Sequence, residues 1–465
     1  MSAVDTIIIG AGMSGMAAGI RLAMFGHAPL ILERHTIAGG MNSYYRRRGV
    51  EFDVGLHAVT NFVPRKTRGA PLIRLLKQLR IGYDELQLAP QIESKISFDH
   101  GRVTLAFNNE PDYFLENIRS RFPKAIDGVR RLDAFVQSYN DLDLDAPPED
   151  SSDIIDSFIS DPLLRDMLLE PLMYYGSWVP RTMRLDNFIT IYKALYKEGF
   201  ARPRDGVRTI IDLLLKKYRD AGGELRLGQG VKEIVVENGC VAGAVTDSGE
   251  FIRTKNILSS AGRIETNGLI KTPFAAESHA SLTPGQLSFT ETIYVLNQSA
   301  KSLGIDSTIV FYNDKERFRY ESPKELIDDA SGVICCPGNY QYDMPLETEP
   351  VRVTNLASYS HWKALSQDDY RKEKEILTET VRSSAERHVA PFGRAVRFTD
   401  MFTPLTVERY TGRINGAVYG SPDKVKNGRT AINGLYLIGT DQGFLGIAGA
   451  ILSGITVTNK YLLGS

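Results

Sequence analysis

The fold of this chain is decided by the stretch Val4-Asp5-Thr6-Ile7-Ile8-Ile9-Gly10-Ala11-Gly12-Met13-Ser14-Gly15. Its first half is a short, mostly β-branched run without glycine or proline, which is typical of a buried parallel strand. Its second half is a G-x-G-x-x-G turn, and an Ala-, Met- and Leu-rich segment up to Phe25 then predicts a helix. Pro29–Leu32 predicts a second strand, which ends at Glu33. Together these segments predict a βαβ unit of a parallel sheet.

Each glycine of this turn has its own physical role. Gly10 permits the tight turn, Gly12 lets the backbone approach a pyrophosphate where a Cβ would collide, and Gly15 lets helix and strand pack closely. The helix N-terminus offers free N–H groups and a partial positive charge to phosphates. Glu33 is placed to accept hydrogen bonds from ribose hydroxyls. The pattern predicts a dinucleotide site; the alternative is an ordinary βαβ unit with a glycine turn.

Length and composition narrow the class of protein. A chain of 465 residues is expected to form two structural regions, and its net charge of −1 gives no reason to expect a nucleic-acid partner. Its cysteines, Cys240, Cys335 and Cys336, form neither a disulfide framework nor a metal-ligand spacing, so we expect no metal site and a reducing, cytoplasmic compartment. The uncharged stretch Gln442–Asn459 is about long enough to span a bilayer, but its Gly, Ser, Thr and Asn content favours a buried helix.

The region from Pro64 to Arg202 differs in character from the start of the chain. Ile92–Phe98 and Arg102–Phe107 predict a hairpin. Helices are expected over Pro111–Phe122, Ile126–Asp141, Ser152–Ile159, Pro162–Met173 and Arg184–Glu198. The last two and their link are rich in large apolar side chains between Leu163 and Phe200. Two interpretations stay open: a helical core, or an apolar pocket wall or lid that touches a membrane.

The α/β pattern returns after Arg204. A helix is expected over Gly206–Ala221, and strands over Glu224–Leu227, Val231–Glu237, Cys240–Thr246 and Phe251–Ser259. Residues 284–400 mix strands with one clear helix, Asp368–His388, as expected for a sheet that covers a substrate. Near the end of the sequence, the strand-like Gly434–Ile438 leads into a second glycine turn, Gly439–Gly449, and a helix to Leu463. This unit would place a second helix N-terminus against an anionic or electron-rich cofactor edge.

The assembled motifs resemble those of amine-oxidase-type flavoproteins, in particular the phytoene desaturase, carotenoid isomerase and retinol saturase branch. The matching segments are the N-terminal turn with Glu33 and Gly39-Gly40, Phe52-Asp53-Val54-Gly55-Leu56-His57, Pro203-Arg204-Asp205-Gly206, Thr403–Tyr410, Gly416–Gly420 and Gly439–Gly454. The resemblance implies non-covalent FAD. By family position it places the cofactor on Gly10, Gly12, Met13, Ser14, Gly15, Glu33, Arg34, Gly40, Met41, Asn42, Val231, Gly439, Asp441, Gly446, Ile447 and Ala448.

The resemblance also implies an α/β fold class, with a discontinuous Rossmann-like FAD-binding domain and an inserted mixed α+β substrate domain. We expect the FAD-binding domain to consist of residues 1–63, 204–283 and 401–465, and the substrate domain of residues 64–203 and 284–400. No second G-x-G-x-x-G with its own βαβ unit is visible, so the electron acceptor or donor should come from outside, as oxygen, a quinone or another diffusible molecule.

The implied function is a FAD-dependent oxidoreductase that desaturates, saturates or isomerises C–C or C=C bonds of a long isoprenoid, carotenoid-like or other lipid substrate. Because a hydrocarbon offers no acid or base, the protein must supply any proton-transfer group. His57 is the first candidate; Tyr174, Tyr175, Arg181 and Arg409 are further candidates that packing or surface pairing would also explain. The alternatives are an amine or amino-acid oxidase and a non-redox prenyl-lipid escort protein. A lipid-like substrate would be compatible with peripheral membrane contact.

Overall fold

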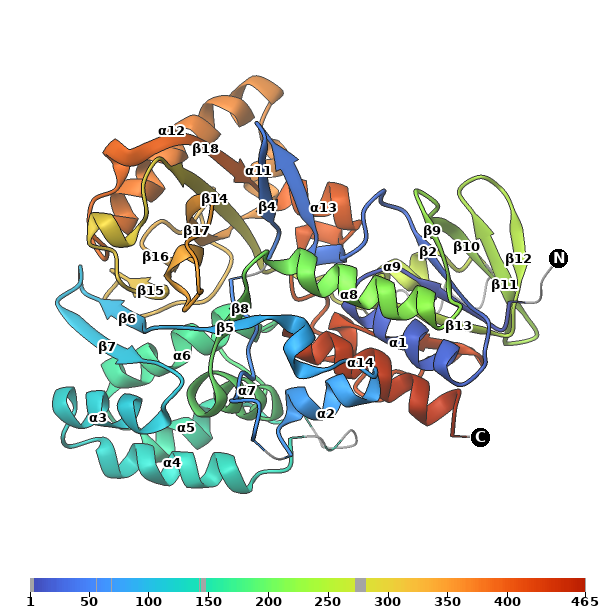
Figure 1. Ribbon diagram of the computed structural model, residues 1–465, viewed down its shortest axis with the longest axis horizontal. Helices are drawn as coiled ribbons and strands as arrows, with labels where there is room; N and C mark the ends of the chain where they lie inside the picture. Colours follow the sequence, from blue (N-terminus) through green and yellow to red (C-terminus); the bar gives the residue numbers. More distant parts are fainter. Residues whose placement is uncertain are drawn as a thin grey trace.

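The computed structural model describes residues 4–55, 57–67, 69–141, 143, 148–271 and 282–464. Leu56, within the Phe52–His57 motif, therefore lies outside the described residues. Figure 1 shows a parallel sheet with its helices on one side of the molecule, a large second sheet on the other, and a layer of helices below the second sheet.

A parallel sheet has the strand order β19-β13-β1-β2-β9, and each neighbouring pair runs parallel. Its strands are β1 (Thr6–Ile9), β2 (Pro29–Glu33), β9 (Glu224–Leu227), β13 (Asn256–Ser259) and β19 (Leu435–Leu437). The predicted N-terminal βαβ unit is thus confirmed, and the C-terminal strand joins the same sheet.

Both faces of the central strands β1 and β2 are covered, which explains their mainly apolar sequences. Ile8 packs on the helices α1 (Met13–Met24), α8 (Val207–Asp220) and α14 (Gly446–Tyr461). Ile7 and Ile9 point to the opposite face, where a three-stranded antiparallel sheet packs. This small sheet consists of β10 (Val231–Glu237), β11 (Cys240–Thr246) and β12 (Phe251–Arg253). Alternate residues of β1 therefore pack on two different layers, the helices on one face and the small sheet on the other.

The helices of the two terminal units pack directly against each other. A Cβ added to Gly454 of α14 would lie 2.1 Å from the carbonyl oxygen of Ser14 in α1. Only a glycine permits this approach. The glycine turns themselves also meet, since a Cβ at Gly439 would lie 3.0 Å from Oγ of Ser14. The N-terminal and C-terminal turns are consequently parts of one structure.

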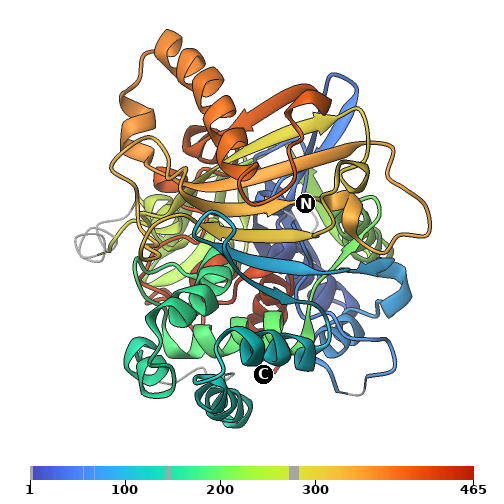
Figure 2. The same cartoon turned by 90° about the vertical axis from the view of Figure 1, so that its left-hand side faces the viewer.

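The second large sheet has the order β18-β14-β17-β16-β15-β6-β7. Its strands are β6 (Ser94–Phe98), β7 (Val103–Phe107), β14 (Ser288–Leu296), β15 (Ile309–Asn313), β16 (Ser331–Cys335), β17 (Glu349–Ala357) and β18 (Val396–Phe402). The predicted hairpin β6–β7 is confirmed, and β6 pairs in parallel with β15 (Figure 2). One face carries α12 (Gln367–Ala385). The short helices α11 (Tyr359–Ala364) and α13 (Pro404–Thr411) lie near its β18 edge (Figure 1).

The other face of this sheet packs on the helical layer. Its helices are α3 (Pro111–Arg121), α4 (Ile126–Ser138), α5 (Ser152–Phe158), α6 (Pro162–Gly176) and α7 (Leu185–Tyr192). The single helix predicted over Arg184–Glu198 is corrected, because α7 passes into a π-helical turn at Lys193–Glu198.

The remaining elements include α2 (Pro71–Gln78), α9 (Arg263–Gly268), the hairpin β3 (Tyr44–Arg47)–β4 (Val50–Asp53), and the pair β5 (Leu88–Pro90)–β8 (Ala201–Pro203).

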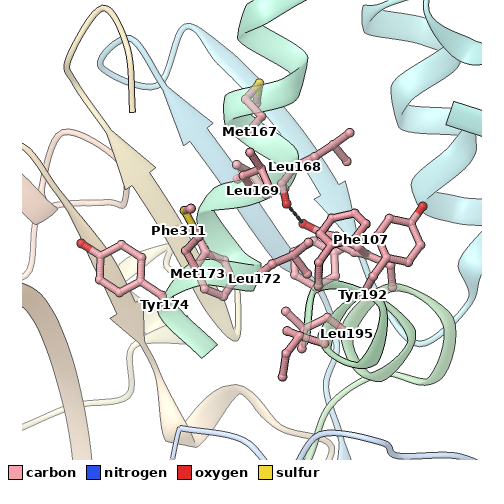
Figure 3. Close-up of a cluster of buried hydrophobic side chains, with 14 of the residues drawn as sticks. Phe107, Met167, Leu168, Leu169, Leu172, Met173, Tyr174, Tyr192, Leu195 and Phe311 are labelled. Carbon is pink, nitrogen blue, oxygen red and sulfur yellow. Dashed lines mark hydrogen bonds between the residues drawn. The ribbon is translucent and has the colours of Figure 1, made fainter. Parts of the chain in front are cut away.

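The apolar segment between Leu163 and Phe200 is mainly a helical core. Leu168, Leu172 and Leu195 are buried, and they gather with Phe107 and Phe311 of the large sheet (Figure 3). Most of the segment is therefore helical core, whereas Tyr174 and Tyr175 line a cavity, as expected for a pocket wall. Among the described residues, no helix combines the length and apolar character that crossing a membrane requires.

Candidate functional site

A cavity of about 1650 Å³ takes its walls from both large sheets and from both ends of the chain. One part is lined by the turns after β1 and β2, by the 3-10 turn Gly40–Asn42, and by the turn after β19. Another part is lined by β14, β16, β17 and the C-terminal end of α6. The cavity thus joins the predicted nucleotide-binding turns to a chamber within the substrate-covering sheet.

The N-terminal turn has the geometry that its glycines predict. Gly10 has a φ of +96°, and an added Cβ would lie 2.3 Å from Oγ of Ser260. A Cβ on Gly12 would meet no atom within 4 Å, because this position faces the open cavity. A Cβ on Gly15 would lie 2.0 Å from the carbonyl oxygen of Gly10, so Gly15 permits close helix–strand packing. The α1 N-terminus has no side-chain cap, which leaves its first N–H groups available to an anion.

Glu33 lies at the end of β2, on the wall of the same cavity. Its Oε2 accepts a hydrogen bond of 2.8 Å from the backbone N–H of Ala11, and its Oε1 accepts one of 2.8 Å from His35. These two bonds hold the carboxylate beside the glycine turn. Each oxygen keeps a further lone pair, so the carboxylate can also accept a hydrogen bond from a bound hydroxyl.

The C-terminal turn supplies a second helix N-terminus. α14 begins at Gly446 without a side-chain cap, and Gly446 faces the cavity with a φ of +69°. Gly439 and Thr440 also line the cavity. Two uncapped helix ends and a glycine cradle therefore meet in one cavity, an arrangement suited to the phosphates of a dinucleotide.

His57 forms a polar corner of the chamber together with Glu291 of β14 and Thr354 of β17. Nε2 of His57 lies 3.4 Å from Oε2 of Glu291 and 3.2 Å from Oγ1 of Thr354. All three residues line the cavity. The backbone carbonyl of His57 accepts a hydrogen bond of 2.9 Å from the hydroxyl of Tyr340. Hydrogen bonds to the backbone carbonyl and to the ring thus both hold His57 at the cavity wall.

A chain of ion pairs runs from this corner into the protein. Glu291 pairs with Arg352, Arg352 donates a hydrogen bond of 3.1 Å to the carbonyl of Asp53, and the Asp53 carboxylate pairs with Arg202. Burial opposes ionisation of Glu291, but the Arg352 guanidinium and the contact with His57 outweigh it and lower the pKa of Glu291 to about 2. Glu291 is therefore a carboxylate throughout the physiological pH range.

The rest of the chamber is aromatic and aliphatic. Its wall residues are Tyr174, Tyr175, Phe289, Val333, Val418, Tyr419, Phe444 and Leu445. The ring of Tyr175 stacks on Phe200 with centroids 5.1 Å apart. Its hydroxyl is buried and meets no hydrogen-bond partner among the described residues, and burial raises the pKa of Tyr175 well above its usual range. Tyr175 thus presents a neutral phenol at the chamber wall.

Comparison with known proteins assigns the chain to a family. The family described as flavin containing amine oxidoreductase matches residues 13–262, more than half of the chain. The chain belongs to this family. It is 25% identical to prolycopene isomerase of Daucus carota, over 96% of this chain and 78% of the relative. It is 22% identical to all-trans-retinol 13,14-reductase of Danio rerio, over 97% of this chain and 85% of the relative. An oxidoreductase from Methanosarcina mazei shares the fold, with a TM-score of 0.68, 16% identity, and coverage of 98% and 100% of the two chains.

FAD is the cofactor of this flavoprotein, and the protein is a flavin-dependent oxidoreductase. The residues present fit a dinucleotide, because the Gly12 position is open to the cavity and the N-termini of α1 and α14 are uncapped there. Glu33 is positioned to accept from a ribose hydroxyl, as in other dinucleotide folds.

The cavity brings together most of the residues predicted to bind the cofactor. Those on its wall are Gly10, Gly12, Met13, Ser14, Glu33, Arg34, Gly40, Met41, Asn42, Val231, Gly439, Gly446 and Ile447. Arg34 is fixed by a hydrogen bond of 3.0 Å from its Nη2 to the carbonyl of Arg409. Gly15 and Ala448 lie in helices behind the wall. Of the predicted catalytic candidates, His57, Tyr174, Tyr175 and Arg409 line the cavity.

Two predicted site residues lie elsewhere. Arg181 is a surface residue, because its side chain is 73% exposed and pairs with Glu321. Asp441 is buried, and its carboxylate is engaged by Lys424, Arg413 and the backbone N–H of Arg263. Its neighbour Thr440 lines the cavity instead. The spacing of the turn could not separate these two positions, because the 3-10 turn Thr440–Gln442 rotates successive side chains in different directions.

Glu291, Thr354 and Thr440 are cavity residues that the sequence analysis missed. For Glu291 the sequence contains one signal that could have predicted a site residue. It is a charged residue in the middle of the otherwise uncharged strand β14, Ser288–Leu296, where a buried strand tolerates a charge only with a partner.

Proposed function

We propose that this flavoenzyme acts on the C–C or C=C bonds of a long, apolar, polyene-type isoprenoid. Support comes from relatives named for prolycopene and all-trans-retinol, and from the chamber itself. The observation that carries the proposal is that the nucleotide-binding turns and an aromatic chamber form one continuous cavity. An apolar substrate would bury its chain against Tyr175, Phe289 and Tyr419 through the hydrophobic effect.

Charge balance in the polar corner supports a neutral substrate over an amine. Arg202 and Arg352 contribute two positive charges, and Asp53 and Glu291 contribute two negative charges. The single carboxylate of this corner that reaches the cavity wall, Glu291, is already neutralised by Arg352. An ammonium group would therefore lose its hydration without gaining an uncompensated anion.

The chain's own residues perform three tasks in this proposal. The flavin, when bound, supplies hydride transfer. The chamber walls orient the substrate and exclude water. His57, the basic side chain of the polar corner that lines the cavity, is placed to exchange a proton with the substrate. The second redox half-reaction would use an external partner such as oxygen or a quinone.

The experiment compares three ligand classes on the purified flavoprotein under anaerobic conditions. We would add a carotenoid polyene in detergent, a retinoid, or a primary amine, to the oxidised and to the reduced protein, and record flavin absorbance and product chromatograms. The proposal expects polyene conversion and no flavin reduction by the amine. Reduction by the amine, followed by peroxide release in air, would establish the amine oxidase alternative. A colourless protein that binds prenyl lipid and takes up no FAD would establish the escort alternative.

A further inference from the structure

We propose that Glu291 is the positioning residue for His57: together with Thr354 it orients the imidazole through Nε2, so that proton exchange with the substrate takes place at the other ring nitrogen, Nδ1. This inference rests on the proposed function for the identity of the substrate. The contact between the two side chains does not depend on that identity, and it can be tested separately.

The geometry around the imidazole assigns different roles to its two nitrogens. Within the described part of the chain, the hydrogen-bonding and ionic contacts of the ring are made through Nε2, to Oε2 of Glu291 at 3.4 Å and Oγ1 of Thr354 at 3.2 Å. Thr354 also lies 3.4 Å from Oε2 of Glu291, so its hydroxyl bridges the pair. With Nε2 facing these partners, Nδ1 is the nitrogen left for a molecule in the cavity.

Burial strengthens the effect of Glu291 on His57. Glu291 is 3% exposed, and the side chain of His57 is 13% exposed. Water therefore screens their interaction weakly. Arg352 holds Glu291 from the opposite side, which fixes the carboxylate in place before any proton moves.

Other titratable groups also lie near this pair, and they contact neither the His57 ring nor the Glu291 carboxylate directly. Tyr45 of β3 donates a hydrogen bond of 3.0 Å to Asp400, and burial raises its pKa well above the usual range. Cys335 of β16 lies beside the His57 carbonyl, and burial raises its pKa to about 12. The Asp53 carboxylate of β4 is paired with Arg202. Glu291 is therefore the anion that acts on the His57 ring.

The proton balance follows from these roles. In the oxidising direction a bound flavin would accept a hydride from one substrate C–H bond, and a neighbouring C–H bond would give its proton to Nδ1 of His57. The electron pair of that second bond would form the new C=C bond. In the reducing direction the reduced flavin would supply the hydride to one carbon of the C=C bond, and the same nitrogen would return the proton to the other carbon. In both directions Glu291 stays a carboxylate and holds the imidazole in position through Nε2.

The test uses the flavin-loaded protein with ¹⁵N-labelled histidine. The His57 ring signals are assigned by comparison with His57→Ala and recorded by NMR at alkaline pH, where the imidazole is neutral. In the parent the proton should reside on Nε2, facing Glu291; in Glu291→Gln the ¹⁵N shifts of Nε2 and Nδ1 should move towards each other, because the neutral ring then populates both tautomers. Glu291→Asp retains a charge opposite Arg352 and should give a smaller shift, so it serves if the Gln variant does not fold. The matched control is Glu349→Gln, which changes a carboxylate on β17 away from the cavity wall and should leave the His57 ring signals unchanged.

A second readout separates this inference from the proposed function. With a polyene that is converted, flavin reduction or reoxidation should be slower in Glu291→Gln than in the parent, and Glu349→Gln should keep the parent rate. If neither Glu291 variant shifts the His57 signals, the inference is overturned, even if the polyene is converted. If the signals shift and no polyene reacts, the pair is confirmed and the proposed substrate class is wrong.

Discussion

The carboxylate of Asp441 and the ammonium of Lys424 form a 3.1 Å ion pair in which each side chain is only 1% exposed. Arg413 lies 3.4 Å from the same carboxylate, and the backbone N–H of Arg263 donates to it at 2.7 Å. Burial lowers the pKa of Lys424 to about 8, against the opposing effect of Asp441. Asp441 thus ties the start of α9 and the segment after α13 to the C-terminal glycine turn from behind the cavity.

Replacing Asp441 by Asn should destabilise the protein by about 3–5 kcal/mol, because Lys424 and Arg413 would stay buried without this counter-charge. Urea unfolding of the FAD-loaded protein would measure the loss. The double variant Asp441→Asn/Lys424→Met should recover part of the stability, since it removes one of the two buried cations. Equal unfolding midpoints for Asp441→Asn and the parent would show that the pair contributes nothing to the fold.

Replacing Gly12 by Val should abolish FAD binding while the protein stays folded. An added Cβ at Gly12 meets no protein atom within 4 Å, so the new side chain would project into the space that the pyrophosphate needs. Flavin content, measured by absorbance after gel filtration, checks the result, and circular dichroism checks the fold. Gly12→Ala should show a smaller loss, because alanine adds one carbon. Full flavin content in the Val variant would place the pyrophosphate elsewhere.

Replacing His57 by Ala should retain FAD and slow the reaction with a converted polyene by about 100-fold or more, the usual range for loss of a general acid or base. Rapid-mixing absorbance of the flavin measures the rate. Arg181→Ala is the matched control, because Arg181 is 73% exposed and pairs with Glu321 outside the cavity. Similar rates in both variants would give His57 a structural role.

The pH dependence of stability should report on Glu291. Its folded-state pKa is lowered from 4.5 to about 2, so its contribution is fully present above the unfolded value and is lost as the pH falls from about 4.5 towards 2. The contribution amounts to about 3 kcal/mol. Urea unfolding between pH 6 and pH 3 should therefore show the stability gap between the parent and Glu291→Gln shrinking as the pH is lowered. A gap that is constant with pH would contradict the assignment of Glu291 as a buried carboxylate.

Local backbone requirements made the cofactor end of the site predictable from sequence. A glycine with positive φ at position 10, an open position 12 and a close packing contact at position 15 each leave a residue signature within a few positions of one another. The C-terminal turn leaves a similar signature, and the two units were expected to meet. The parallel strands followed from uninterrupted apolar runs that are buried on both faces.

The polar corner could not be predicted in this way. His57, Glu291 and Thr354 come together because β14 and β17 pair with Glu291 opposite Thr354, and no local pattern records that register. Asp441 shows the opposite case, a residue that the structure places behind the cavity wall. A family position suggested a cofactor contact, but the local 3-10 turn aims Thr440 at the cavity and buries Asp441 among cations from distant segments. Local periodicity carries no information about such long-range pairs.

The meeting of the α1 and α14 N-termini at one cavity has a consequence for biosynthesis. The ribosome must synthesise every residue from Met13 to Gly446 before the second helix N-terminus can reach the first, so the complete FAD site forms late in the synthesis of this stretch. Until then the apolar faces of the unfinished parallel sheet stay uncovered, and such surfaces favour aggregation. Cellular riboflavin status should therefore influence how much newly made polypeptide matures, as pulse-labelling in riboflavin-limited cells would show.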